Sequence, residues 1–306
     1  VGAFFCPDTI HPMKIERQSP CKINLLLNVI RRRDDGFHEL ETLLHPVALC
    51  DDLEFMATAA GIQIECSHPG LKSDESNLIF RAARSFLETA EIDSGVYVRH
   101  EKRIPLAGGL AGGSANAAHT LRGLNELFDH PLNDRQLHEI AAAHGSDINF
   151  FLQDSPALAT GRGENIVPCG PLPALAGKGL LLIHPGFGIP TPWTFRELAD
   201  YPDALTGDAA KGEALVKHLQ QADLQPEPNL LYNSLEAPVL PKYPLLRIFQ
   251  EFLTARGAIV AMMSGSGSTT YALTDSPASA AALKDEFVGR FGPGCWLHAL
   301  PLSSPQ

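Results

Sequence analysis

The chain of 306 residues lacks several features that mark particular classes of protein. No apolar run reaches the roughly 18 residues that a membrane-spanning helix needs, and the first twenty residues lack the apolar core of a signal peptide. The six cysteines are scattered without a CxxC pair, which argues against a zinc or dithiol site. We therefore expect a cytoplasmic protein with reduced thiols and no membrane partner.

Positive charge is also in short supply. The chain has 24 Lys and Arg against 35 Asp and Glu, a net charge of −11, which argues against a general nucleic-acid surface. A site for an anionic ligand must then be locally positive, through a few basic side chains and backbone amides. The hydrophobic content of 44% and the length are typical of a globular protein with two domains.

A glycine-rich run, PLAGGLAGGSANAA from Pro105 to Ala118, is the most informative feature that is present. Apolar residues at helical spacing predict that a helix from about Ser114 to Phe128 follows it. Glycine lets the backbone approach a ligand with its N–H groups turned inward, and a helix N-terminus adds partial positive charge. The run therefore predicts a phosphate cradle, with Lys102 just before it.

The run has three other interpretations. A Walker A loop requires Gly-Lys-Ser/Thr, and the triplet Gly112, Gly113, Ser114 has no lysine, so this interpretation fails. A dinucleotide fingerprint requires an acidic residue about twenty positions later, near Asp129 or Asp134, but it should follow the first strand of the chain and not several. The third alternative is a tight turn whose glycines serve only packing.

Lys22, Asn24 and Asp147 each have a structural and a catalytic interpretation. Lys22 and Asn24 share one face of an alternating strand predicted over residues 20–30, where a lysine is ordinarily solvated. Asp147, in HGSDINFFL, either caps a turn or acts as a general base.

Two further segments are equally ambiguous, and the rest of the chain indicates its organisation. His38 is either a surface or a ligand-binding residue, and SGSGS over 264–268 is either a simple turn or an anion nest. Helices and strands, among them strands over 39–49 and 53–58, mix without βαβ regularity, which predicts an α+β fold. The proline-rich stretch over 169–178 predicts a domain boundary, and residues 1–12 a peripheral extension.

In combination and in order, these segments resemble the GHMP kinase superfamily. PCKINLLLNVIRRRDDGFHELETLLHPV resembles its opening segment, KRIPLAGGLAGGSANAA its phosphate loop, and HGSDINFFL and MMSGSGSTTYAL its two later motifs. The DGFH and IPTPWTF segments are similar to those of the members that phosphorylate 4-diphosphocytidyl-2-C-methyl-D-erythritol. The matches run from about Met13 to Leu300.

The resemblance implies a fold and a reaction. The fold has an N-terminal domain over 13–168 similar to ribosomal protein S5 domain 2 and a ferredoxin-like domain over 169–306, with the site between them. The reaction moves the γ-phosphate of ATP, with Mg²⁺, onto the 2-hydroxyl of that substrate in the non-mevalonate isoprenoid pathway. Asp147 would take the proton of the hydroxyl, and Lys22 would hold the aspartate and the developing charge.

The same resemblance implies two further sets of contacts with small molecules, in a monomer or homodimer. The ATP-binding set is Asn77, Leu78, Lys102, Pro105, Leu106, Ala107, Gly108, Gly109, Leu110, Ala111, Gly112, Gly113 and Ser114, with Ser114 also the candidate side-chain ligand for Mg²⁺. The substrate-binding set is Asn24, Phe37, His38, Thr191, Phe195, Gly265 and Ser266. Within it, Phe37, His38 and Phe195 would surround the cytosine.

The chain departs from the family pattern in the phosphate loop. Ala107 and Ala111 stand where glycine is usual, and Ala115 where a second serine is common. If positions 107 and 111 require a positive φ, each alanine strains the loop by roughly 1 kcal/mol. Two alternatives follow: another GHMP small-molecule kinase with a different alcohol, or a nucleotide-binding homologue that transfers little or no phosphate.

Overall fold

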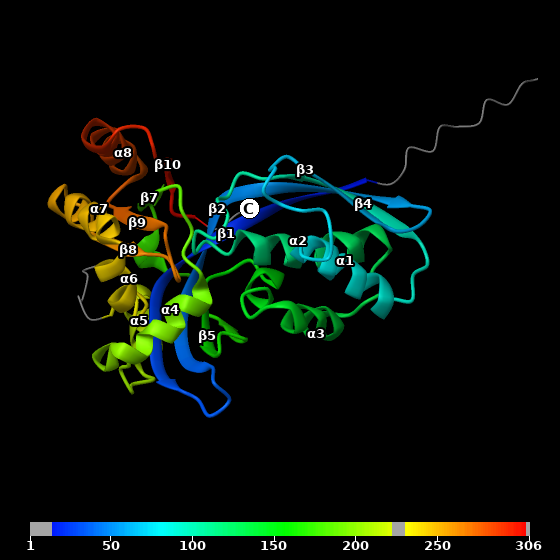
Figure 1. Cartoon of the computed structure of the whole chain (residues 1–306), viewed down its shortest axis with the longest axis horizontal. Helices are drawn as coiled ribbons and strands as arrows, with labels where there is room; N and C mark the ends of the chain where they lie inside the picture. Colours follow the sequence, from blue (N-terminus) through cyan, green and yellow to red (C-terminus); the bar gives the residue numbers. More distant parts are fainter. Residues whose placement is uncertain (1–13, 222–229, 304–306) are drawn as a thin grey trace, which may run out of the picture.

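The computed structural model describes residues 14–221 and 230–303, so the predicted extension over residues 1–12 lies outside the described residues. Two sheets and their covering helices form two lobes, which confirms the α+β class (Figure 1). No helix within these described ranges is long and apolar enough to cross a membrane.

The first sheet is built around one long central strand. Its strands are β1 (Lys14–Arg32), β2 (His38–Thr58), β3 (Ile62–Cys66), β4 (Gly95–Glu101), β5 (Ala157–Gly161) and β6 (Asn165–Pro168). β1 pairs along one edge of β2, while β4 and β5 share the other edge, and β3 and β6 lie outside them. All pairs are antiparallel except β3 with β4.

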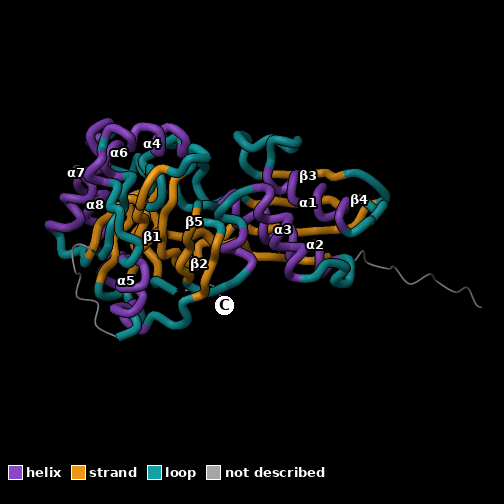
Figure 2. The backbone as a smooth tube through the Cα atoms, turned by 90° about the horizontal axis from the view of Figure 1, so that it is seen from below, coloured by secondary structure: helices purple, strands orange, loops and turns teal. Residues whose placement is uncertain are grey.

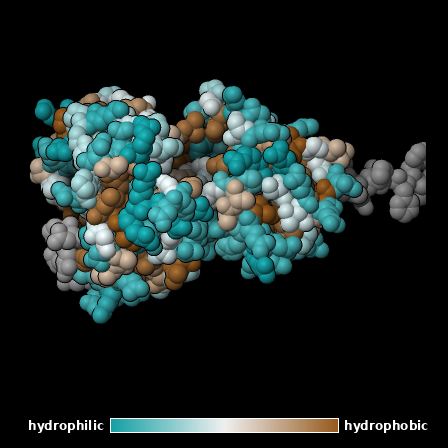
Figure 3. Space-filling view, turned by 60° about the horizontal axis from the view of Figure 1, so that its bottom comes forward, coloured by the Kyte–Doolittle hydropathy of each residue, from teal (hydrophilic) through white to brown (hydrophobic). Residues whose placement is uncertain are grey.

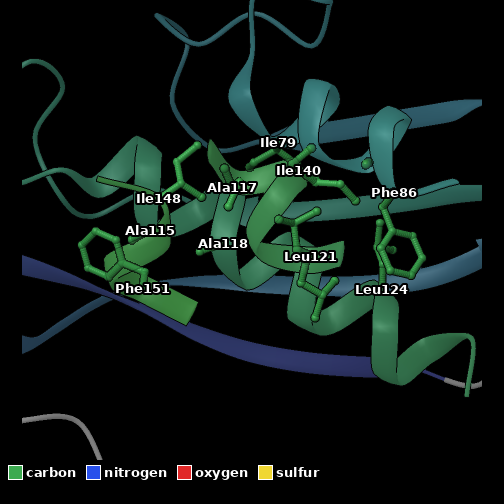
Figure 4. Packing of buried hydrophobic residues seen from close by; sticks show 14 of the residues in the cluster. Ile79, Phe86, Ala115, Ala117, Ala118, Leu121, Leu124, Ile140, Ile148 and Phe151 are labelled. Atoms are coloured by element: carbon green, nitrogen blue, oxygen red, sulfur yellow. The ribbon is translucent and has the colours of Figure 1, made fainter. Parts of the chain in front are cut away.

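Three helices cover one face of this sheet: α1 (Leu78–Thr89), α2 (Gly112–Leu127) and α3 (Asp134–His144) (Figure 1). α2 confirms the helix predicted after the glycine run and begins two residues earlier, at Gly112. Its apolar face packs Leu121 and Leu124 against Phe86 of α1 and Ile140 of α3 in a common core (Figure 4). Full burial of one leucine side chain stabilises a fold by about 1.5–3 kcal/mol, so this core fixes the start of α2 against the sheet.

The second sheet has the order β10-β7-β9-β8 and is antiparallel throughout. Its strands are β7 (Gly179–His184), β8 (Val260–Met263), β9 (Thr270–Thr274) and β10 (Trp296–Pro301). α7 (Pro244–Ala255) and α8 (Pro277–Phe291) contribute Phe249, Leu253 and Phe287 to the core on one face.

Shorter elements surround the junction of the two lobes: α4 (Thr191–Glu197), α5 (Lys211–Leu219) and α6 (Glu236–Lys242), with 3₁₀ turns η1 (Asn149–Leu152), η2 (Pro173–Leu175), η3 (Leu198–Asp200) and η4 (Pro202–Ala204). The sequence pattern does not predict α6. Its seven residues include Pro238 and Pro241, which indicate a loop when they are considered locally. In the structure, Val239 and Leu240 of this helix are buried against residues of α4 and α7.

β1 and β2 belong to both lobes (Figures 1 and 2). Cys21, Ile23 and Leu25 of β1 share one buried cluster with Leu182 and Tyr271 of the second sheet. The hydroxyl of Tyr271 also donates a hydrogen bond of 2.9 Å to the backbone carbonyl of Asn24. This shared core places the segment around Lys22 at the wall between the lobes, while the domain boundary predicted over 169–178, between β6 and β7, stays a prediction.

Candidate active site

The phosphate loop, residues 105–114, connects β4 to α2 in a left-handed conformation at three positions. Ala107, Gly109 and Ala111 have φ angles of 51°, 78° and 54°. Ala111 is the N-cap of α2, and no side chain caps the helix there. The first N–H groups of α2 therefore remain available to an anion, as in other phosphate-binding helix termini.

Ala107 and Ala111 both have the positive φ that makes alanine unfavourable. We expect Ala107→Gly to raise the free energy of unfolding by about 0.5–1 kcal/mol, because relief of about 1–2 kcal/mol of left-handed strain exceeds the added entropy of the unfolded chain. Denaturant titration measures the change. The matched control is Ala142→Gly on the exposed side of α3, which should lower stability by about 0.5–1 kcal/mol. Destabilisation by both substitutions would contradict the strain at Ala107.

The second glycine loop, Ser264–Ser268, joins β8 to β9 and lies directly against the phosphate loop. The hydroxyl of Ser264 donates to the carbonyl of Gly109 at 3.0 Å, and the N–H of Thr269 donates to the carbonyl of Gly108 at 3.1 Å. A Cβ on Gly109 would overlap the carbonyl oxygen of Ser264, so the absence of a side chain there permits this approach. The two loops together form one wall of a cavity.

Lys22 lies on β1 with 3% of its surface exposed. Its ammonium donates hydrogen bonds of 2.6 Å to the side-chain oxygen of Asn24 and 2.8 Å to the carbonyl of Gly109. Burial lowers the pKa of Lys22, and the negative charge of Asp147 acts in the opposite direction. Lys22 is therefore a buried side chain held against the phosphate loop, and the interpretation as a solvated strand residue does not apply.

Asp147 lies between α3 and η1 and faces the same cavity as Lys22. Throughout residues 14–221 and 230–303, no hydrogen bond or ion pair uses its carboxylate, and η1 has no side-chain cap. The capping interpretation of Asp147 is therefore wrong. A partly buried carboxylate that has no structural partner and faces a buried lysine can accept a proton from a bound ligand.

These groups line a cavity of about 560 Å³ in the hollow between the lobes (Figure 3). The predicted residues along its wall are Lys22, Asn24, Leu78, Lys102, Pro105, Leu106, Ala107, Gly108, Gly109, Ala111, Gly112, Gly113, Ser114, Asp147, Thr191, Phe195, Gly265 and Ser266. The ammonium of Lys102 already has a partner, because it forms a buried ion pair with Asp51.

A second cavity of about 480 Å³ adjoins the first and contains the predicted aromatic residues. Phe37, His38 and Phe195 line it, and the rings of His38 and Phe195 are 5.3 Å apart between centroids. Phe37 is 55% exposed, which leaves its ring accessible to a planar ligand. Burial lowers the pKa of His38, and the charge of Arg32 lowers it further, so both favour the neutral imidazole.

Two of the predicted ATP-binding residues lie elsewhere. Asn77 does not line either cavity: its side chain caps α1 by accepting from the N–H of Ile79 at 2.9 Å. Leu110 is buried in the core, and its carbonyl accepts a backbone hydrogen bond from Lys22. Leu110 thus positions the strand that carries the lysine, and a contact with ATP at either residue stays a prediction.

The sequence interpretation missed Thr42, Ser146 and Arg162, which all line the first cavity. Thr42 accepts a hydrogen bond of 2.8 Å from the side-chain amide of Asn24 and so orients the partner of Lys22. Ser146 directly precedes Asp147 in HGSDINFFL, and this position beside a candidate general base could have identified it as a site residue. Arg162 lies in GRGEN, which has no motif that could have identified it.

Comparison with known families gives two matches that together span much of the chain. Residues 77–161 match the GHMP kinases N terminal domain, and residues 215–294 match the GHMP kinases C terminal domain. Both motifs of the first cavity, the phosphate loop and the segment with Asp147, lie in the first match.

Individual relatives are more specific. A 4-diphosphocytidyl-2-C-methyl-D-erythritol kinase of Acaryochloris marina is 38% identical over 274 residues, which cover 86% of this chain and 88% of the relative. The crystal structure of a 4-(cytidine 5'-diphospho)-2C-methyl-D-erythritol kinase superimposes with a TM-score of 0.78 at 33% identity, covering 94% of this chain and 99% of the other. A homoserine kinase from Cytophaga hutchinsonii, with a TM-score of 0.71 at 18% identity over 99% and 98% of the two chains, shares the fold.

Proposed function

Since the chain belongs to the 4-diphosphocytidyl-2-C-methyl-D-erythritol kinase family of GHMP kinases, we propose that it transfers the γ-phosphate of ATP to the 2-hydroxyl of that substrate. This reaction is a step of the non-mevalonate isoprenoid pathway. The observation that carries the proposal is the position of Asp147 and Lys22 beside the phosphate loop, in a cavity continuous with an aromatic one.

Asp147 acts on the acceptor hydroxyl. A tertiary alcohol is a poor nucleophile near neutral pH, so phosphoryl transfer to it depends on positioning and on a base within reach. Because the carboxylate of Asp147 forms no hydrogen bond with the described residues, it is free to accept the hydroxyl proton. The oxygen then attacks the γ-phosphorus, and ADP leaves.

Lys22 supplies positive charge at the reacting centre. Asn24 and the carbonyl of Gly109 fix its ammonium, so no reorganisation is needed when negative charge develops on the transferred group. A buried cation interacts more strongly with that charge than an exposed one, because the surroundings screen it less. The amides of the phosphate loop and the N-terminus of α2 add further stabilisation of the triphosphate.

Mg²⁺ fits this site as a companion of ATP. Among the described residues, no group of three or more His, Cys, Asp or Glu side chains could hold a metal ion. The hydroxyl of Ser114 is an oxygen donor of the type that Mg²⁺ prefers, and it lines the cavity of the phosphate loop, where it would hold the ion together with the phosphates of ATP. When bound with ATP, the ion offsets the charge of the phosphates.

The aromatic cavity accommodates the cytidine end of the substrate. Phe37 and Phe195 offer ring faces for the base, and the neutral imidazole of His38 can donate one hydrogen bond and accept another. We place the enzyme in the cytoplasm, as a monomer or homodimer.

A substrate panel tests the proposed function. Purified protein with ATP and Mg²⁺ is offered 4-diphosphocytidyl-2-C-methyl-D-erythritol, mevalonate or homoserine, and ADP release is measured. We expect turnover with the cytidyl substrate alone. Turnover of mevalonate or homoserine instead would assign another GHMP kinase activity, and ATP binding without any transfer would support the nucleotide-binding alternative.

A further inference from the structure

The two cavities meet at a junction formed by residues that line both. These residues are Leu40, Ser146, Arg162, Thr191 and Phe195. On the phosphate-loop side of the junction lie Lys22 and Asp147, and on the other side lie Phe37 and His38. A ligand that reaches from the aromatic residues to the catalytic pair must cross this junction.

Among the described residues that line both cavities, Arg162 has the one charged side chain. It lies in the turn between β5 and β6, and antiparallel pairing of β5 with β2 brings this turn close to the start of β2. Its Nε donates to Glu164 at 3.4 Å, and its guanidinium lies 4.8 Å from the centre of the Phe37 ring. No hydrogen bond to the described residues uses its two terminal nitrogens, so an anion can bind to both.

The charges around the junction favour an anion. Arg32, Arg162 and Arg196 line the aromatic cavity, whose lining contains no carboxylate among the described residues. Asp147 is the single acidic residue along the described wall of the first cavity. Glu164 and Glu197 pair with Arg162 and Arg196 but line neither cavity, so the lining itself is positive, in contrast with the net charge of −11 of the chain as a whole.

We propose that Arg162 binds the diphosphate that links the two ends of the substrate. This assignment rests on the proposed function, because a cytidine diphosphate derivative with its base at Phe37 and its alcohol at Asp147 has its two phosphates at the junction. The planar guanidinium can hold phosphate oxygens through two parallel hydrogen bonds, and the hydroxyls of Ser146 and Thr191 are additional donors. Glu164 and Phe37 fix the orientation of the arginine before the substrate arrives.

The role of Arg162 is to bind and position the substrate. A diphosphate is equally charged in the bound substrate and in the transition state, so loss of this contact removes binding that is common to both. The KM of the cytidyl substrate should therefore rise while kcat and the KM of ATP stay the same. Loss of a hydrogen-bonded charge pair of this kind should raise the KM of the cytidyl substrate about 10- to 100-fold.

The test compares how tightly cytidine and CDP bind to the whole protein, by calorimetry with a non-hydrolysable ATP analogue occupying the phosphate loop. We expect the wild type to bind CDP at least about tenfold more tightly than cytidine. Arg162→Met should abolish this preference and leave the affinity for cytidine within about twofold, because methionine retains an apolar contact with Phe37.

Arg256→Met is the matched control. Arg256 also lies over an aromatic ring, 5.1 Å from the centre of Phe252, and pairs with the carboxylate of Glu286, but it lines neither cavity. This variant should keep the full preference for CDP.

Two outcomes would overturn the assignment: an unchanged preference for CDP in Arg162→Met, or an equal loss of cytidine and CDP binding. Failure of the proposed function alone gives a different result. The wild type then still prefers CDP to cytidine, but it does not phosphorylate the cytidyl alcohol.

Discussion

Asp147→Asn is expected to lower kcat by about 10²- to 10⁴-fold while ATP binds with nearly unchanged affinity. Asparagine has the shape of aspartate but cannot take a proton from the acceptor alcohol. The substitution should not disturb the fold, because the carboxylate makes no hydrogen bond or ion pair in the part of the chain that the structure describes. Steady-state kinetics with the cytidyl substrate give kcat, and calorimetry gives the dissociation constant of ATP.

The control for this variant is Asp154→Asn. Asp154 pairs with Arg122 on the exposed side of the first lobe and lines neither cavity. Its replacement should leave kcat within about twofold, since loss of an exposed ion pair is worth about 1 kcal/mol or less in stability. If Asp147→Asn retained more than about a tenth of the wild-type kcat, Asp147 would not be the general base.

Gly109→Ala is expected to damage both stability and activity. At a φ of 78°, a Cβ would overlap the carbonyl oxygen of Ser264 and lie 3.0 Å from the amide nitrogen of Gly267. Both neighbours are backbone atoms, which cannot move aside as a flexible side chain can. Backbone strain of about 1–3 kcal/mol and overpacking of about 1–3 kcal/mol combine to lower the free energy of unfolding by about 2–5 kcal/mol.

The same substitution displaces the carbonyl that orients Lys22, so kcat/KM for ATP should fall at least about tenfold even under conditions in which the variant is folded. Gly289→Ala, on α8, is the control: nothing lies within 4 Å of an added Cβ, and stability should rise by about 0.5–1 kcal/mol. Wild-type kinetics in folded Gly109→Ala would show that the contact between the two glycine loops is not needed for catalysis.

Local sequence patterns predicted much of the fold, and they failed where a residue's partner is distant along the chain. Alternation identified the face that Lys22 and Asn24 share, and helical spacing identified α2. The pattern predicted two strands over 39–49 and 53–58, whereas β2 is continuous from His38 to Thr58. A buried aspartate is compatible with a strand interior here because Asp51 pairs with Lys102, fifty-one residues later.

The candidate site was predictable to the extent that its residues lie in motifs. Lys22, the phosphate loop and Asp147 each belong to a recognisable segment, and they line one cavity. The resemblance also implied Lys102 as an ATP-binding residue; its side chain lines the cavity and is paired with Asp51, and a contact with ATP there stays a prediction. Arg162 escaped notice because its significance depends on the pairing of β2 with β5, which brings GRGEN near Phe37. The positive φ angles of Ala107 and Ala111 are likewise properties of the folded loop.

The apolar cluster shared by β1 and the second sheet has a practical consequence for dissecting this enzyme. Expression of either half alone, cut within residues 169–178, would expose Cys21, Ile23 and Leu25 in one fragment and Leu182 and Tyr271 in the other. The apolar surface that each fragment would then expose promotes aggregation. New chain ends are therefore better introduced by circular permutation, which keeps both faces in one polypeptide and preserves the wall that carries Lys22.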